Sequence, residues 1–169
     1  LLLIYVLPVS AQQNMGAEAA QLTKQIEELS KLGNYAEAVP LAQRMVDIRK
    51  RTLGEDHPDY ATSLQDLGFL YDKQGKYAEA EPLYRRSLTI REKVLGPSHL
   101  AVAFSLNNLA GIYRQQGRYA EAEPLFERCL AIREKTQGPD HLDVAYSLNN
   151  LALLYWDQAR YDEAEPLYK

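Results

Sequence analysis

The sequence has little of several features that functional sites need. It contains one cysteine, Cys129, among 169 residues, which excludes an internal disulfide and a metal site built from several thiols. Its formal net charge of −4 is small, and no basic cluster of the kind that binds phosphate backbones occurs. We therefore expect no nucleic-acid partner. Cys129 falls at a small-residue position between predicted helices, where a buried and unreactive thiol is expected.

Motifs of catalysis are missing as well. The sequence shows no nucleophile–base pair, no glycine-rich phosphate loop and no cleft of paired carboxylates. We predict that the chain is not an enzyme and that it uses no cofactor, metal or small-molecule substrate.

The sequence also lacks a long hydrophobic run. LLLIYVLPV, at residues 1–9, is too short to span a bilayer, which takes about 20 apolar residues. With the Ser-Ala-Gln-Gln that follows, it resembles the end of a secretory signal peptide cut after Ala11. Residues 1–11 are then a signal remnant, and the protein is exported to the periplasm or the extracellular space. The alternative is a hydrophobic end that packs on the first helix of a cytoplasmic protein.

What the sequence does contain is a tandem repeat with a step of 42 residues. GNYAEAVPL at 33–41, GKYAEAEPL at 75–83, GRYAEAEPL at 117–125 and ARYDEAEPL at 159–167 follow one another at this spacing. Residues 77–118 and 119–160 agree at 28 of 42 positions. Self-similarity of this kind is typical of proteins whose units stack on their neighbours.

Each unit has the pattern of two helices. In the second unit, Leu64, Leu67 and Tyr71 have the spacing of one helical face. Gly75-Lys76 interrupts that pattern as a turn, and a second apolar stripe follows. Pro82 is expected near the first turn of the second helix, where a missing N–H costs little.

The residues that recur at fixed places carry a family signature. The matching positions are Leu64, Leu67, Gly68, Tyr71, Ala80, Tyr84 and Ser87; Leu106, Leu109, Ala110, Tyr113, Ala122, Phe126 and Cys129; and Leu148, Leu151, Ala152, Tyr155, Ala164 and Tyr168. In these the chain resembles the tetratricopeptide repeat (TPR) family, and its long step resembles kinesin light chains and many bacterial repeat proteins. The resemblance implies an all-α fold, a right-handed α-solenoid of stacked antiparallel helix pairs.

The resemblance also divides the chain. Residues 12–169 form the array, with a degenerate first repeat at 18–51, repeats at 58–95 and 100–137, and a truncated fourth at 142–169. A degenerate first unit is typical of a capping repeat. Because the sequence stops within the second helix of the fourth unit, we expect the natural protein to continue.

One face of each first helix has an unusual composition. On a helical wheel Leu106 and Tyr113 point to the core, whereas Asn107 and Asn108 of the SLNNLA motif fall on the opposite side. The family resemblance implies that this side lines a concave groove. The predicted groove residues are Asp66, Phe69, Lys73, Phe104, Asn107, Asn108, Arg114, Gln115, Tyr146, Asn149, Asn150, Leu153 and Trp156.

Amides and aromatic rings together suit the recognition of a protein segment. Amides can bond to the backbone of an extended peptide, and aromatic rings supply apolar anchors. The resemblance implies peptide contact by Asn108 and Asn150. As alternatives, Asn107 and Asn149 hydrogen-bond between adjacent helices and only stabilise the stack, and Trp156 packs on a further unit.

Two other groups are expected to be structural. His57, His99 and His141 lie one to a loop between units, too far apart to share a metal, whose bonds measure about 2 Å. We expect them to cap the helices that follow. The many Glu and Arg of YAEAEPLYRR and IREK are expected on exposed helix faces with i, i+4 partners.

The predicted function is a non-catalytic protein–protein interaction module that binds a peptide or protein segment in the concave groove. Two alternatives remain. The array could be the recognition arm of a larger effector with a protease-like or kinase domain beyond residue 169, or a scaffold that self-associates end to end.

Overall fold

The computed structural model describes residues 9–168, with side chains from Asn14 onward. Every regular element within that range is a helix. The elements are α1 (Val9–Lys31), α2 (Tyr35–Leu53), α3 (Pro58–Asp72), α4 (Tyr77–Leu95), α5 (Leu100–Gln115), α6 (Tyr119–Gln137), α7 (Leu142–Asp157), α8 (Tyr161–Ala164) and the 3-10 helix η1 (Glu165–Tyr168).

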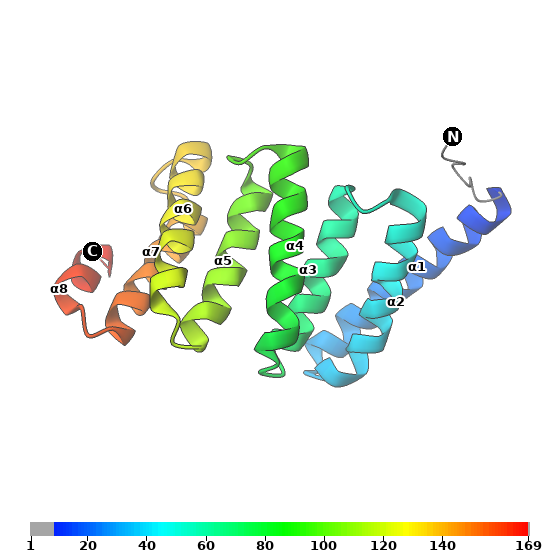
Figure 1. The fold of residues 1–169 in the computed structure, drawn as a ribbon, viewed down its shortest axis with the longest axis horizontal. Helices are drawn as coiled ribbons and strands as arrows, with labels where there is room; N and C mark the ends of the chain where they lie inside the picture. Colours follow the sequence, from blue (N-terminus) through cyan, green and yellow to red (C-terminus); the bar gives the residue numbers. More distant parts are fainter. Residues whose placement is uncertain (1–8, 169) are drawn as a thin grey trace.

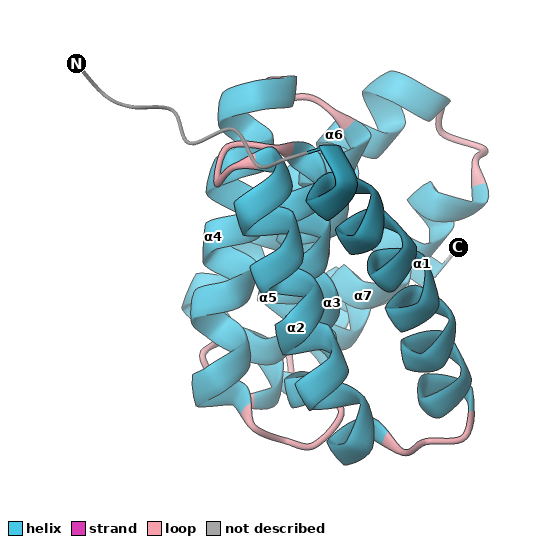
Figure 2. Ribbon diagram, turned by 90° about the vertical axis from the view of Figure 1, so that its right-hand side faces the viewer, coloured by secondary structure: helices cyan, strands magenta, loops and turns pink. Residues whose placement is uncertain are grey.

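The helices stand side by side in chain order, in pairs joined by short turns (Figure 1). α1 packs on α2, α3 on α4, α5 on α6 and α7 on α8, and the second helix of each pair packs on the first helix of the next. Viewed from the N-terminal end, the loops gather at the two ends of the helices (Figure 2). This arrangement confirms the α-solenoid predicted from the sequence.

The segment proposed as a signal remnant lies mostly outside the described residues. Only Val9–Ala11 of it are described, as the beginning of α1. No helix within residues 9–168 has the length and apolar character that a bilayer crossing requires.

Histidines cap the first helices of three units. The Nδ1 atoms of His57, His99 and His141 each accept a hydrogen bond of 3.1 Å from the backbone N–H two residues further on. The bond satisfies a donor that the helix itself leaves without a partner. The predicted capping role is confirmed.

Pro82 differs from the expectation. Because α4 begins at Tyr77, Pro82 lies in the second turn of the helix rather than the first. Its missing N–H leaves the carbonyl of Ala78 without a helical partner. Ala78 is exposed, so water can bond to that carbonyl.

Cys129 lies in the core between units. Its side chain is fully buried, and its Sγ lies 3.7 Å from Oγ of Ser147 on α7. Burial raises the pKa of the thiol. The predicted buried thiol is confirmed.

The turn inside each helix pair requires a left-handed backbone. Gly33, Gly75 and Gly117 have φ angles of 77°, 71° and 73°, whereas Ala159, at the same place in the fourth unit, has φ 59°. A residue with a side chain is strained in this region by about 1–2 kcal/mol, and glycine is not.

Ala159→Gly is therefore expected to raise the free energy of unfolding by about 1 kcal/mol, since it relieves that strain. Urea denaturation followed by circular dichroism measures the change. The reciprocal control, Gly117→Ala, should lower stability by a similar amount. Equal midpoints for the wild type and both variants would contradict the strain.

Candidate functional site

Buried arginines fix the first helices that carry the predicted groove. Arg91 on α4 is only 6% exposed, and its Nη1 donates to Oγ of Ser105 at 2.8 Å and to Oε1 of Gln65. Arg133 on α6 donates in the same way to Oγ of Ser147, at 2.8 Å. Each arginine thus ties the second helix of one unit to the first helix of the next.

These contacts correct the expectation that the IREK arginines are exposed. The missed signal is the strict recurrence of arginine at 49, 91 and 133 together with serine at 63, 105 and 147. Nη1 of Arg49, Arg91 and Arg133 also donates to the backbone carbonyl ten residues further on, at 2.8, 3.3 and 3.0 Å. The arginine–carbonyl bond therefore occurs between every pair of successive units, whereas among the described residues the bond from arginine to serine forms at Arg91 and Arg133 and not at Arg49.

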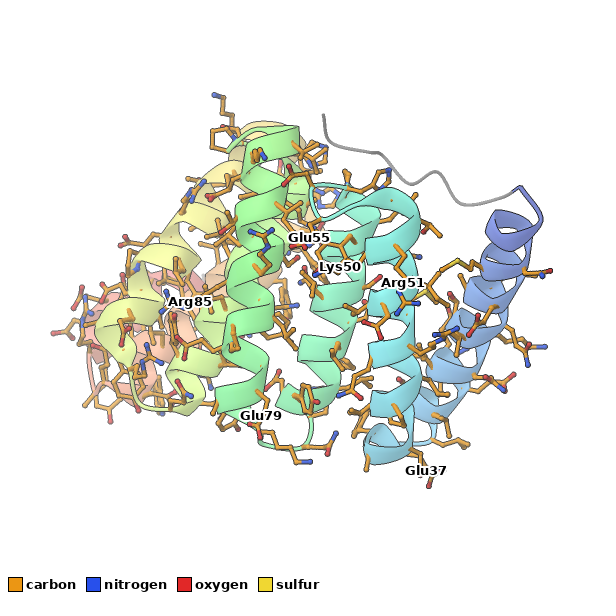
Figure 3. All side chains as sticks on the ribbon, turned by 45° about the vertical axis from the view of Figure 1, so that its right-hand side comes forward. Glu37, Lys50, Arg51, Glu55, Glu79 and Arg85 are labelled. Atoms are coloured by element: carbon orange, nitrogen blue, oxygen red, sulfur yellow. The ribbon has the colours of Figure 1, made fainter. Side chains whose placement is uncertain are left out.

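Other charged residues do lie on the outer surface, as expected. Figure 3 shows Glu37, Lys50 and Arg51 projecting from α2, and Glu79 and Arg85 from α4. Lys50 pairs at 2.8 Å with Glu55, in the loop that follows α2. Exposed pairs of this kind contribute little to stability.

The opposite surface, formed by the first helices, exposes aromatic rings. Phe69 is 38% exposed, Phe104 49%, Tyr146 54% and Trp156 57%. Large apolar side chains exposed in a row are typical of surfaces that bind other proteins.

Three hollows lie along this surface. The N-terminal pocket, about 470 Å³, is lined by Thr23, Ile26, Glu27, Ser30, Lys31, Ala42, Met45, Arg49, Thr62, Ser63, Asp66, Phe69 and Leu70. The central hollow, about 370 Å³, is lined by Phe69, Asp72, Lys73, Tyr77, Tyr84, Asn107, Asn108, Gly111, Arg114, Gln115, Phe126, Tyr146 and Asn150. The C-terminal hollow, about 360 Å³, is lined by Leu100, Phe104, Asn107, Asn108, Arg133, Asp143 and Tyr146.

The asparagines of the two SLNNLA motifs have different surroundings. Nδ2 of Asn150 donates to Oδ1 of Asn107 at 2.8 Å, and the two residues are 9% and 8% exposed. The alternative in which Asn107 bonds between adjacent helices therefore holds for Asn107, with Asn150 as its partner, whereas Asn149 is exposed. Asn108 is half-buried and faces both the central and the C-terminal hollow.

Charges in the central hollow are mostly paired or partly desolvated. Arg114 on α5 forms an ion pair of 2.6 Å with Asp157 on α7. The Lys73 ammonium lies 5.2 Å from the centre of the Phe69 ring. Burial raises the pKa of Asp72, and the nearby Lys73 opposes that shift.

The buried hydroxyl of Tyr84, at the wall of the central hollow, has no hydrogen-bond partner among the described residues. The corresponding residue of the third unit is Phe126, which shows that the fold does not need this hydroxyl.

Ten of the predicted groove residues thus line at least one hollow. Asn149, Leu153 and Trp156 are not among the lining residues, and the Trp156 ring lies edge-on to Tyr161 at a centroid distance of 4.8 Å. Sequence reasoning missed the contribution of α1 and α2 to the N-terminal pocket. Their unit is degenerate, so no repeated position pointed to it.

The sequence profile of the tetratricopeptide repeat family matches residues 29–93, 73–135 and 101–169. No curated protein matches the sequence.

Several solved structures share the fold. One is a protein of Podosopora anserina described as a kinesin light chain with nearly identical TPR-like repeats. Its sequence is 28% identical to this chain, and the TM-score is 0.80. The match covers 92% of this chain and 72% of that chain. A single-substitution variant of that protein is 30% identical with a TM-score of 0.76, covering 88% and 70%. The fold is also shared by BtubC (BKLC) of P. vanneervenii, which is 22% identical with a TM-score of 0.64. That match covers 90% of this chain and 70% of the other chain. From the profile match, the 42-residue step and the stacked helix pairs, this chain belongs to the tetratricopeptide repeat family.

Proposed function

We propose that the chain is a non-catalytic interaction module that holds an extended segment of a partner protein along the surface of α3, α5 and α7. Tetratricopeptide repeats generally mediate protein–protein interactions. The observation that carries the finer proposal is the C-terminal hollow, which is lined by two exposed rings, Phe104 and Tyr146, together with the amide of Asn108.

The chemistry of this hollow suits a polypeptide. An amide side chain offers both a donor and an acceptor, which match a peptide group of an extended chain. The two rings supply apolar area at a low cost in conformational entropy. Among the described side chains, the one hydrogen bond to the Asn108 amide is long, 3.5 Å from Nδ2 of Asn107 to Oδ1 of Asn108, so Asn108 retains bonding capacity for a ligand.

The proposal is tested with peptides selected from a displayed random library. Binding of the best peptide is measured by titration calorimetry. The double variant Phe104→Ala, Tyr146→Ala is expected to weaken peptide binding at least about tenfold, as is usual when central anchors are lost. Asn108→Ala is expected to weaken peptide binding about tenfold. Circular dichroism should stay unchanged, because none of the three side chains is fully buried.

Val94→Ala is the matched control, since it truncates an exposed apolar residue near the end of α4, on a second helix. Failure to select any peptide would contradict the proposed function, and so would equal binding by all variants.

A further inference from the structure

Gly111 stands in the middle of α5, at a position where the neighbouring units have large residues. Phe69 on α3 and Leu153 on α7 lie one repeat step before it and one repeat step after it. Apart from proline, glycine is the least favourable residue in a helix interior, because it loses the most backbone freedom on folding. If the fold needs glycine here, a side chain at this position should collide with a neighbour.

The packing around Gly111 shows no such need. Its backbone is helical without a positive φ angle, and a Cβ atom added to it would meet no neighbouring heavy atom within 4 Å. Gly68 on α3 is different, because a Cβ atom there would lie 2.9 Å from Cε1 of Tyr84. Packing therefore explains Gly68, whereas Gly111 leaves open space beside α5.

The open space at Gly111 belongs to the central hollow. Gly111 lines that hollow together with the rings of Phe69 on α3 and Tyr146 on α7. Asn108 lies one turn before Gly111 and Gln115 one turn after it, and residues at these spacings share a helix face. The backbone of α5 is therefore uncovered between two amide side chains.

The central hollow also contains a polar group that lacks a partner. Tyr84 lines the hollow and is 1% exposed, and its hydroxyl has no hydrogen-bond partner among the described residues. A buried polar group without a partner costs free energy, and a ligand that supplies the partner recovers it. This hydroxyl is an observation separate from the glycine, and it points to a ligand with hydrogen-bonding groups.

The charges of the central hollow compensate one another. Arg114 pairs with Asp157 at 2.6 Å, and Asp72 and Lys73 contribute one charge of each sign. The lining therefore does not favour a ligand group of either charge. The peptide groups of a main chain are uncharged, and each carries one donor and one acceptor.

We propose that the main chain of the bound segment comes closest to the array at Gly111, where it lies against the uncovered backbone of α5. Peptide groups next to that contact supply partners for the amide of Asn108 and the hydroxyl of Tyr84. The proposal rests on the proposed function, since it assigns the closest contact of the same bound segment.

The choice of glycine favours a main chain over a side chain as the occupant. A side chain of the segment would need only a small residue at position 111, and alanine would leave nearly the same room in a more stable helix. The close approach of two backbones is what removal of the Cβ atom allows.

The test uses the best peptide selected from the displayed library against the wild type. Gly111→Leu should weaken its binding at least about tenfold, and Gly111→Ala should weaken it less, because the added atoms occupy the place of the peptide main chain. Neither variant should lower the urea midpoint, since both residues favour a helix more than glycine does. Tyr84→Phe should also weaken binding and leave the midpoint the same or higher.

Gly16→Leu and Gly16→Ala are the matched controls. Gly16 lies in α1, a Cβ atom there also meets nothing within 4 Å, and Gly16 lines none of the three hollows. Both controls should leave peptide binding unchanged and should not lower the urea midpoint.

A second measurement distinguishes the main chain from a side chain. N-methylation of single peptide bonds in the selected peptide should weaken binding to the wild type at one position or more. At such a position the loss should be smaller for Gly111→Leu, because the contact is already disrupted. Replacing the side chain of the same peptide residue by alanine should have little effect.

The outcomes separate the two proposals. If the selected peptide depends on Phe104 and Tyr146 but binds Gly111→Leu or Tyr84→Phe as tightly as the wild type, the inference is wrong and the proposed function stands. If truncation of a peptide side chain, and not N-methylation, removes the difference between the wild type and Gly111→Leu, a side chain fills the hollow and the inference is again wrong. A lower midpoint for Gly111→Ala would show that the fold itself needs the glycine and would overturn the inference. If no peptide is selected, the proposed function itself is wrong.

Discussion

Arg91→Ala is expected to lower the free energy of unfolding by about 3 kcal/mol. The side chain is 6% exposed, and it donates to Ser105 on the next unit and to Gln65 on its own unit. Truncation leaves those buried oxygens with fewer donors and opens a cavity at the joint. Urea denaturation measures the loss.

Arg85→Ala is the matched control, because Arg85 lies on the same helix but is exposed and forms an ion pair with Glu81, at 2.8 Å. Arg85→Ala should lower the free energy of unfolding by less than about 0.5 kcal/mol. If Arg91→Ala lowered the free energy of unfolding by less than about 1 kcal/mol, the buried arginine would not be what stabilises the contact between α4 and α5.

Phe126→Ala is expected to lower stability by about 3–5 kcal/mol, the usual range for a buried phenylalanine. The ring is 2% exposed and packs in the largest apolar cluster, with Ala110 and Leu151 from the helices on either side. Because each unit contacts only its neighbours, the loss should be local. Hydrogen exchange should show reduced protection in α5, α6 and α7, with α1 and α2 nearly unchanged.

Val102→Ala, in α5 of the same unit but in a separate apolar cluster, provides a smaller truncation for comparison. It should destabilise less than Phe126→Ala, since fewer carbon atoms are removed from the core. Equal loss of protection along the whole chain would contradict the local effect and indicate a single cooperative unit.

Local pattern was enough to predict the helices and their caps. The spacing of Leu64, Leu67 and Tyr71 depends only on the helical period, and a capping histidine acts within two residues of its own position. The exposure of Phe104 follows from its place on the helical wheel of one helix. All these features are determined within one unit.

Features that depend on how units sit against each other could not be predicted in this way. The bond from Asn150 to Asn107 joins residues in neighbouring units, so its partner depends on the register between α5 and α7. The burial of Arg91 depends on α5, which belongs to the following unit. The N-terminal pocket is lined partly by residues of α1 and α2, whose unit departs from the repeat, so no recurring position indicates it.

The bond from Arg49, Arg91 and Arg133 to the backbone carbonyl ten residues further on has a consequence for how such repeat proteins change length. An in-frame duplication of one repeat period would place the same donor opposite the same acceptor on both sides of the insertion. The lengthened protein would therefore keep this bond at each new junction.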